Sequence, residues 1–482
     1  MDLLKELDHT DVEETGGELH RFATELYPIC RSITGNGTRR TLAKIGELIP
    51  VQIFEVPTGT PVFDWTVPKE WNIRDAFIKS PAGERVVDFQ KSNLHVVNYS
   101  VPVRATLKFA ELRPHLFTIP DHPDWIPYRT SYYNEGWGFC LSHNQMVALE
   151  DGDYEVCIDS TLEEGHLSYG ECYLPGRSTD EVLISCHICH PALANDNLSG
   201  LTVATFLARL LTQRNHRYSY RFLFIPGTIG AITWLARHLD TVERIRHGLV
   251  LTCVGDPGGF HYKKSRRGNT EIDRVVAHVL AHCGDSSEIM EFSPYGYDER
   301  QYCSPGLNLP VGCLMRSVWG TFQEYHTSAD NLEFIQPKQL AASLRVCAAI
   351  LDTLENNQSY RRINPYGEPQ LGRRGLYRAT GGETIEMGVN AQLWVLNFSD
   401  GQHSLLDIAE RSGISFSLIS DAAELLCDAE LISPIKAESG DSAIALSKES
   451  VEGSSRASYV PAVEKISYGV ATEKNANSTD RP

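Results

Sequence analysis

The feature that most constrains this fold is a repeated alternation of apolar runs and helical patterns that begins at Glu181. The run EVLISCH leads into NLSGLTVATFLARLL, where apolar residues recur three and four positions apart, as on one face of a helix. The runs YRFLFIP, HGLVLTCVGD and LPVGCLMRS likewise precede helical patterns. Continuous apolar strands that each lead into a helix indicate a sheet covered on both faces. We therefore predict an α/β fold for this part of the chain.

The segments outside this alternation differ in composition and in their hydrophobic pattern. Residues 1–50 contain two helical patterns, whereas residues 51–169 consist of short runs rich in Val, Ile and Tyr, broken by Pro, Gly and Asp. These short runs at residues 51–169 predict a mostly β domain. A basic linker and three helical patterns follow over residues 361–436, as in a winged helix. Residues 437–482 have the Ser-, Glu- and Ala-rich composition of a disordered tail.

Charge and composition exclude several classes of function. The 482 residues carry a net charge of −18, which repels phosphate backbones and anionic membrane surfaces. The third helical pattern of the expected winged helix, SFSLISDAAELLCDAELI, is acidic and lacks the Lys and Arg that contacts to DNA require. The first thirty residues have no apolar signal-peptide core, and no apolar run is long enough to span a membrane. We therefore expect a cytoplasmic protein without nucleic-acid or membrane partners.

The segment SCHICHPALANDNLSG, residues 185–200, permits three chemical interpretations. Cys186 and Cys189 form a C-x-x-C, as in redox enzymes or half of a zinc site, and with His190 they form the haem-attachment pattern C-x-x-C-H. A redox pair would open a helix, whereas Pro191 and further residues intervene here. A structural zinc site would need a second ligand pair, and haem attachment would need an exported chain. A hydrolase metal site that begins at His187 is therefore favoured, with the cysteines as buried hydrophobes.

Metal-binding side chains follow the ends of the expected strands. Ligands in such sheets bind beyond the carboxyl ends of the strands, so residues just past each strand are expected to meet. Those residues are His187, His190, Asp196, Asp256, Glu324, His326 and Asp330. Each has an ordinary explanation alone, since Asp196 could cap a helix and Asp256 could form a turn. Their common position on one rim instead indicates imidazole and carboxylate ligands for Zn²⁺.

Several motifs in order resemble a known family. The stretch NDNLSG before an amphipathic helix resembles the DN-x-SG signature of co-catalytic zinc aminopeptidases, and EYHTSAD resembles their closing Y-H-T-x-x-D segment. Together with PYGYDERQYCSPG and the winged helix, these motifs are similar to a bacterial family of aminopeptidase-like proteins often associated with polysaccharide biosynthesis. The resemblance covers most of residues 15–435. It implies a mixed sheet flanked by helices over residues 1–50 and 170–360, interrupted by an inserted β domain at 51–169.

The resemblance also implies a set of metal ligands. His187 would bind one zinc ion together with Asp256, Asp196 would bridge, and His326 would bind a second ion. His190 is a substitute or additional ligand, because spacing alone does not show which histidine faces the site. The expected cofactor is thus one zinc ion or two.

Two departures from the family pattern affect the catalytic residues. Cys189 stands where the peptidases have an Asp, and Gly227-Thr228 follows FLFIP where they have a Glu-Glu pair that supplies the general base and a zinc ligand. A two-zinc hydrolase needs a carboxylate to transfer the proton. The nearest candidates for a substitute base or ligand are the loop residues Asp298, Glu299 and Arg300, together with Glu324. Of these we expect Glu324 and Glu299 to be catalytic.

Residues near these carboxylates are expected to bind the substrate, and they are Arg300, Tyr297, Tyr325 and Asp298. A guanidinium can hold a carboxylate group as a fork, and aromatic rings commonly line ligand pockets.

The resulting hypothesis is a zinc-dependent hydrolase of amide bonds. Its substrate would be a peptide, or an aminoacyl or N-acyl amino-sugar intermediate of polysaccharide biosynthesis. The alternative is a metal-binding pseudoenzyme or binding scaffold, which the missing glutamate pair at Gly227 motivates. The acidic winged helix is expected to act as an interaction module that could form a homo-oligomer.

Overall fold

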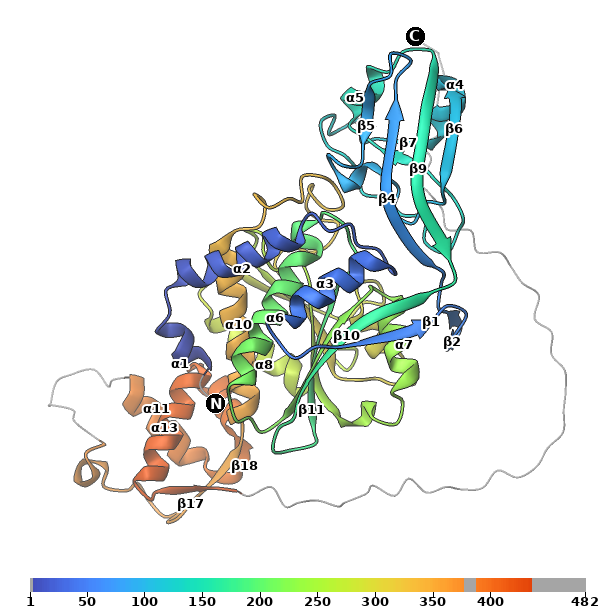
Figure 1. The fold of residues 1–482 in the computed structure, drawn as a ribbon. Helices are drawn as coiled ribbons and strands as arrows, with labels where there is room; N and C mark the ends of the chain where they lie inside the picture. The colour runs from blue at the N-terminus through green and yellow to red at the C-terminus, as the bar shows by residue number, and fades with distance from the viewer. Residues whose placement is uncertain (1–2, 377–386, 436–482) are drawn as a thin grey trace, which may run out of the picture. The chain divides into compact units, whose positions relative to one another are not determined.

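The structure is a computed structural model in which residues 3–376 and 387–435 are described (Figure 1). Its centre is an eight-stranded mixed sheet with the strand order β1-β10-β12-β11-β13-β16-β14-β15. The strands of this sheet are β1 (Gln52–Pro57), β10 (His166–Leu174), β11 (Glu181–His187), β12 (Ser219–Ile225), β13 (Ile245–Leu251), β14 (Phe260–Lys263), β15 (Ser287–Met290) and β16 (Val311–Met315).

The four central strands of this sheet run parallel and are buried along their length, except for Arg246 near the start of β13. Alternate residues of β11 enter different cores: Val182 and Ile184 face one side of the sheet, and Leu183 faces the other. Burial on both faces explains why these strands are apolar without interruption. Because the strands are parallel, their carboxyl ends meet at one edge, where His187 is paired with Ile225 of β12.

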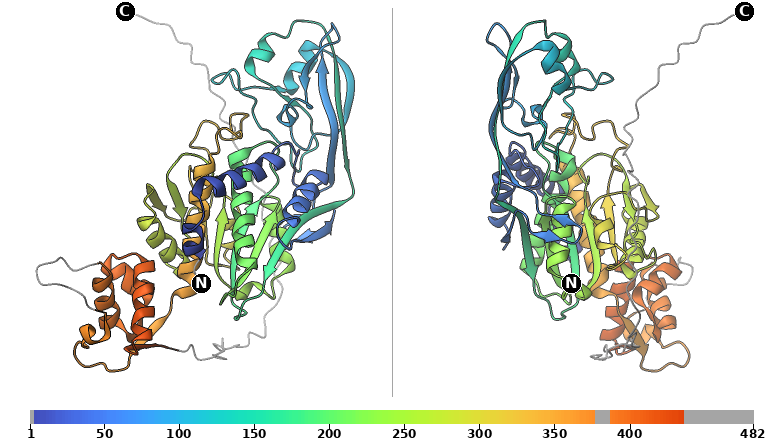
Figure 2. Two further views of the ribbon diagram at one scale, coloured as in Figure 1. Left: turned by 60° about the vertical axis from the view of Figure 1, so that its left-hand side comes forward. Right: turned by 90° about the vertical axis from the view of Figure 1, so that its right-hand side faces the viewer.

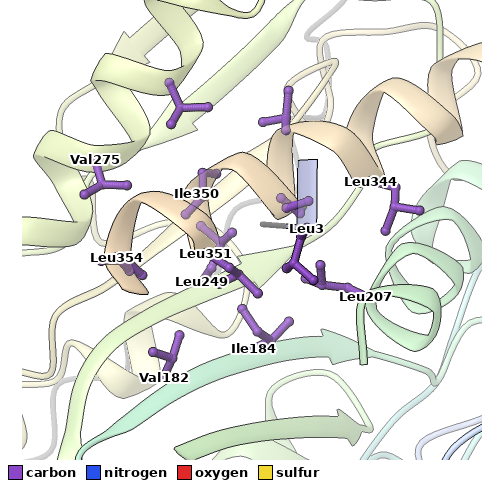
Figure 3. Close-up of a cluster of buried hydrophobic side chains, with 14 of the residues drawn as sticks. Leu3, Val182, Ile184, Leu207, Leu249, Val275, Leu344, Ile350, Leu351 and Leu354 are labelled. Atoms are coloured by element: carbon purple, nitrogen blue, oxygen red, sulfur yellow. The ribbon is translucent and has the colours of Figure 1, made fainter. Parts of the chain in front are cut away.

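Helices cover both faces of the sheet (Figure 2). The larger core contains residues of α1 (Leu3–Asp8), α2 (Val12–Leu26), α3 (Asn36–Gly46), α6 (Gly200–Thr212), α8 (Glu271–His282) and α10 (Pro337–Asn356). Figure 3 shows Leu344, Ile350, Leu351 and Leu354 of α10 above Ile184 and Leu249 of the sheet. The other face is covered by α7 (Ile229–Arg237) and the short helix α9 (Glu299–Tyr302), with η4 (Val242–Arg244) beside them. These features confirm the predicted α/β class with a mixed sheet flanked by helices.

A second, four-stranded sheet lies between β1 and β10 in the sequence and has its own core. Its strands are β4 (Glu70–Lys79), β5 (Arg85–Asp88), β6 (Val103–Lys108) and β9 (Asp153–Glu163). The connections contain two small strand pairs, β2 (Pro61–Val62) with β3 (Trp65–Thr66) and β7 (Leu116–Phe117) with β8 (Phe139–Cys140), and the helices η1 (Asn93–His95), α4 (Phe109–Leu112), η2 (Arg113–His115) and α5 (His143–Val147). The main sheet extends past the expected domain boundary, because β1 and the start of β10 pair within it.

The C-terminal part forms three helices and a small sheet. They are α11 (Met387–Phe398), α12 (Leu405–Ser412) and α13 (Phe416–Asp428), with the strand order β18 (Asp400–Ser404), β17 (Ser359–Arg362), β19 (Ile432–Pro434), and η5 (Leu371–Arg374) in the linker. This arrangement is that of the expected winged helix. The expected tail at 437–482 lies outside the described residues. Within residues 3–376 and 387–435, no helix has both the length and the apolar character needed to cross a membrane.

A buried ion pair joins the sheet strands away from the carboxyl edge. Arg221 of β12 donates two hydrogen bonds to Glu181 of β11, at 2.7 and 2.9 Å, and a further one to Glu171 of β10. The Glu181 side chain is 1% exposed, so water contributes little to its solvation. Such a pair is costly to break on one side, because the remaining charges stay buried without a partner.

We expect Arg221→Met to lower the free energy of unfolding by about 3–5 kcal/mol, because Glu171 and Glu181 would lose their counter-charge. Urea denaturation followed by circular dichroism measures this change. The matched control is Arg74→Met, which breaks a pair with Asp159 whose side chains are 73% and 40% exposed and should leave the midpoint unchanged. Equal effects of the two substitutions would contradict the role of Arg221.

Candidate metal centre

Two imidazoles from separate segments of the chain meet at the carboxylate of Asp196. Nε2 of His187, the last residue of β11, lies 2.8 Å from Asp196 Oδ1. Nε2 of His326, in the loop before α10, lies 3.0 Å from Asp196 Oδ2. Asp196 itself belongs to the turn η3 (Ala194–Ser199) that precedes α6, and it is completely buried. Both carboxylate oxygens therefore face an imidazole.

His190 completes this cluster. Its Nε2 lies 3.9 Å from Asp196 Oδ2, and its ring centroid is 4.9 Å from that of His187 and 5.3 Å from that of His326. One ligand atom each from His187, His190 and Asp196 lie within 4.8 Å of one another, close enough to hold one metal ion. His190 is thus directed into the site together with His187, which the sequence left open.

The buried groups have protonation states that suit metal binding. Burial alone would raise the pKa of Asp196, but the neighbouring imidazoles of His190 and His187, and hydrogen bonds from His187 and His326, hold it well below its usual range. Burial lowers the pKa of His190 to about 3, so its ring is neutral near pH 7 and offers a lone pair. An ionised carboxylate and a neutral imidazole are the forms in which these side chains bind a cation.

The turn that carries Asp196 is fixed by a second carboxylate. Asp330 accepts hydrogen bonds from the backbone N–H of Asn195 at 2.5 Å and of Asp196 at 3.0 Å. Asn197 donates through Nδ2 to the carbonyl of Leu251 at the end of β13, at 3.0 Å. Asp330, which the sequence places only on the rim, therefore positions the central carboxylate of the cluster.

A buried arginine holds the loop that carries His190. Arg31 is 1% exposed, and its guanidinium donates to the carbonyls of His190, Pro191 and Leu26, each at 2.7 Å. Burial lowers its pKa to about 10, so the side chain stays charged near pH 7. No sequence motif reveals this residue, because an arginine that binds backbone carbonyls has no partner side chain.

The other predicted ligand, Asp256, is turned toward different partners. Its carboxylate accepts hydrogen bonds from Asn195 Nδ2 and Gly258 N, both at 2.8 Å, and from Ser317 Oγ at 2.6 Å. In the structure it orients Asn195, the residue before Asp196. Its contact with zinc stays a prediction.

The two cysteines of the C-x-x-C lie on opposite faces of the sheet and are not bonded to each other. Sγ of Cys189 accepts a hydrogen bond from the backbone N–H of Gly227 at 3.2 Å and lies 3.5 Å from His190 Nδ1. A Cβ atom at Gly227 would lie 3.3 Å from this sulfur and 3.5 Å from His187 Cβ. Cys189 thus fills the space beside Gly227, and the redox interpretation has no support from the geometry.

Asp298 brings a further carboxylate to this part of the site. It is 2% exposed and accepts a hydrogen bond from the backbone N–H of Thr228 at 2.7 Å. Burial raises its pKa to about 6, against the opposing influence of His187 and the Thr228 hydrogen bond. A buried carboxylate therefore faces Gly227-Thr228 from the loop at Tyr297.

The two glutamates expected to be catalytic lie in different surroundings. Glu299 is completely buried, and its carboxylate lies 2.6 Å from the ammonium of Lys263, which is also completely buried. Glu324 is half-buried, and its backbone carbonyl accepts a hydrogen bond from Thr327. Arg300 is half-buried and close enough to lower the pKa of Asp298. The catalytic and substrate-binding roles of these residues stay predictions.

Tyrosine rings surround the histidines. Tyr297 stacks on His187 with a centroid distance of 4.9 Å, and Tyr325 stacks on His326 at 4.0 Å. Tyr128, from the segment between β7 and β8, contacts both His190 and His326, at 5.2 and 5.1 Å. Its backbone N–H donates to the carbonyl of His326 at 2.8 Å. The inserted segment thus supplies one wall of the site.

Comparisons with known proteins agree with this architecture. The family described as a domain of unknown function, DUF4910, matches residues 20–357, and a winged helix-turn-helix family matches residues 358–434. A Clostridium acetobutylicum protein is 53% identical over 420 residues, which cover 87% of this chain and 96% of that protein. It is provisionally named for polysaccharide biosynthesis and for an aminopeptidase-like domain.

Solved structures show the same fold. A crystal structure from Clostridium acetobutylicum, of a protein provisionally described as a peptidase, has a TM-score of 0.85 at 50% identity and covers 89% of this chain and 99% of its own. A zinc aminopeptidase from Bacillus subtilis has a TM-score of 0.52 at 13% identity and covers 71% of this chain and 95% of its own, which is a likeness of fold.

The fold and the His/Asp cluster thus define an aminopeptidase-like protein with a C-terminal winged helix. The chain belongs to the DUF4910 family, and the resemblance carried by NDNLSG and EYHTSAD is confirmed.

We expect Arg31→Met to lower the free energy of unfolding by about 3 kcal/mol or more, because three buried carbonyls would lose a charged donor. Thermal and urea denaturation measure the change. Arg21→Met, at an exposed position of α2, is the control and should have no effect. If the two variants unfold alike, Arg31 does not hold the His190 loop.

Proposed function

We propose that the protein is a zinc-dependent hydrolase of amide bonds. The observation that carries this proposal is the convergence of His187, His190, Asp196 and His326 at the carboxyl edge of the parallel strands, in a site walled by tyrosines. The aminopeptidase-like fold and the provisional names of the two Clostridium acetobutylicum relatives support it.

The donor set fits zinc. Imidazole nitrogen and carboxylate oxygen are typical zinc ligands, and three such atoms lie within 4.8 Å of one another. His187, His190 and Asp196 would hold one ion, and His326 would be a fourth ligand or hold a second ion through the other oxygen of Asp196. Zinc bound there would polarise an amide carbonyl and lower the pKa of a water molecule.

Asp298 would move the proton in this reaction. Water would add to the amide carbon, the carbon–nitrogen bond would break, and Asp298 would take the proton from water and pass it to the leaving nitrogen. A carboxylate with a pKa of about 6 is suited to accept and return a proton near neutral pH. Glu299 is less suited, because Lys263 neutralises it. Glu324 remains the second candidate for this role.

The substrate we favour is an aminoacyl or N-acyl amino-sugar amide, with a peptide as the other class. The provisional name of the relative, which refers to polysaccharide biosynthesis, supports the first class. The rings and hydroxyls of Tyr128, Tyr297 and Tyr325 offer stacking surfaces and hydrogen-bonding groups that suit a sugar. Arg300 would hold a carboxylate of a peptide substrate.

Zinc binding is the first expected outcome. Purified protein should contain zinc, and His190→Ala should weaken zinc binding by at least about 100-fold, since outer-shell groups alone contribute 10- to 100-fold. Competition with a chelating dye measures the affinity, and His166→Ala, at an exposed position of β10, is the control. His326→Ala distinguishes the stoichiometries, because it reduces two bound ions to one only if His326 holds the second. Unchanged zinc affinity in His190→Ala would remove this residue from the ligand set.

The second expected outcome concerns the group that transfers the proton. Asp298→Asn should lower kcat by about 10²- to 10⁴-fold with zinc content unchanged. A screen of aminoacyl amides, peptides and N-acyl amino sugars supplies the substrate for this measurement. Glu324→Gln is the matched comparison and should stay within a few-fold of the parent. The reverse ranking of the two variants would transfer the role to Glu324.

A binding scaffold without catalysis is the second candidate function. Gly227-Thr228 provides no side-chain carboxylate at the end of β12, which favours this alternative. This alternative would be established if the protein holds zinc but shows no hydrolysis, of any of these substrate classes, that Asp196→Ala abolishes.

A further inference from the structure

A cavity of about 470 Å³ lies between α1, α8, α10 and α13, where the winged helix packs against the rest of the chain. We call it the α8–α13 cavity, and the residues that matter here are His278, His282, Ser417 and Ser420 in its lining. Its volume is within the range of sites that bind small molecules. No residue of the metal centre lines it, so any ligand there is distinct from the proposed substrate.

The first wall of interest is the N-terminus of α13. This 13-residue helix begins at Phe416, and the N-cap residue Ser415 makes no side-chain capping hydrogen bond. Its hydroxyl instead lies 3.3 Å from Ser417 Oγ. The first backbone N–H groups of a helix have no partner within the helix and attract negative charge. Uncapped donors of α13 therefore border the cavity together with the Ser417 and Ser420 hydroxyls.

The second wall carries a buried histidine whose Nε2 lacks a partner. His278 of α8 is 7% exposed, and its Nε2 makes no hydrogen bond within the described residues. His282, one turn later, differs, because its Nδ1 lies 2.8 Å from the His278 carbonyl and its Nε2 lies 3.3 Å from the Gly413 carbonyl. A buried polar atom without a partner is uncommon in folded proteins. A ligand in the cavity would supply the missing hydrogen bond.

The acidic side chains of the lining are already engaged. Asp285 lies 3.0 Å from Arg316, and Asp421 lies 3.2 Å from Lys5. Asp352 accepts hydrogen bonds from the backbone N–H groups of Leu3 and Leu4, at 3.0 and 2.8 Å. Of the remaining groups, the first backbone N–H groups of α13 can only donate, and the serine hydroxyls and the His278 imidazole can donate, which favours a ligand with acceptor oxygens.

We propose that the α8–α13 cavity binds a small anion through a phosphate or carboxylate group, held by the first turn of α13 and the imidazole of His278. One wall belongs to the winged helix and the others to the aminopeptidase-like part. An anion in this position would stabilise the packing of the winged helix against α8 and α10. This site would operate whether or not the metal centre is catalytic.

The test uses the full-length protein labelled with ¹⁵N-histidine. Inorganic phosphate and acetate are titrated separately at constant ionic strength, with sodium chloride as the balancing salt, and the ring resonances are followed by NMR. We expect saturable shifts of His278 with at least one anion. A response to phosphate alone assigns the site to phosphate esters, and a response to acetate alone assigns it to carboxylates.

A matched pair of variants completes the test. His278→Phe keeps an aromatic ring and removes both ring nitrogens, so it should weaken anion binding, measured by calorimetry, by about tenfold or more. His282→Phe should have a smaller effect, because both of its nitrogens face backbone carbonyls. Circular dichroism checks that both variants fold, and the resonances of the parent protein give an answer that needs no variant. The proposal is overturned if neither anion shifts His278 up to tens of millimolar, or if His278→Phe binds as tightly as the parent.

Discussion

The site depends on one interaction, the shared contact of the Asp196 carboxylate with His187 and His326. A fully buried carboxylate without partners would cost several kcal/mol, so the chain must bring those partners to it. One imidazole ends a central strand, and the other lies 130 residues after Asp196 in the sequence. Asp330 fixes the backbone at Asp196. The parallel sheet supplies the common edge that makes this convergence geometrically simple. The fold thus provides the partners that a buried Asp196 carboxylate requires.

The sequence could predict where the backbone of the site lies better than how its side chains point. Alternating apolar strands and helices place His187, His190 and His326 near one edge, and the structure brings all three to Asp196. Periodicity fixes the position of a Cα atom on the rim, whereas the direction of a side chain depends on local hydrogen bonds. Local hydrogen bonds direct the Asp256 carboxylate toward Ser317 and the Asp298 carboxylate toward Thr228. Arg31 could not be predicted from the sequence, since its partners are backbone carbonyls, two of them distant in the sequence.

The departure from the peptidase pattern at Gly227 has a steric counterpart. Cys189 Sγ occupies the space that any side chain at Gly227 would enter, and it accepts the Gly227 N–H. A glutamate at this position would require the sulfur to move, and the sulfur also contacts His190 Nδ1. The two positions at which this chain departs from the peptidase pattern, 189 and 227, are therefore in direct contact. Under the proposed function, the imidazole of His190 would take the place of a carboxylate ligand, and Asp298 would supply a carboxylate from its own loop.

The winged helix turns the first turn of its third helix toward the rest of the chain. In DNA-binding domains of this kind, the recognition helix contacts base edges with its N-terminal residues. Here the first turn of α13 borders the cavity against α8 and α10, and Asp421 is paired with Lys5 of α1. The same helix α10 begins seven residues after Asp330 and lines the cavity further along. Because a helix of 20 residues is about 30 Å long and stiff, α10 links the loop of His326 to the winged helix as a single element. The winged helix is therefore packed against the same helix that follows the loop of His326.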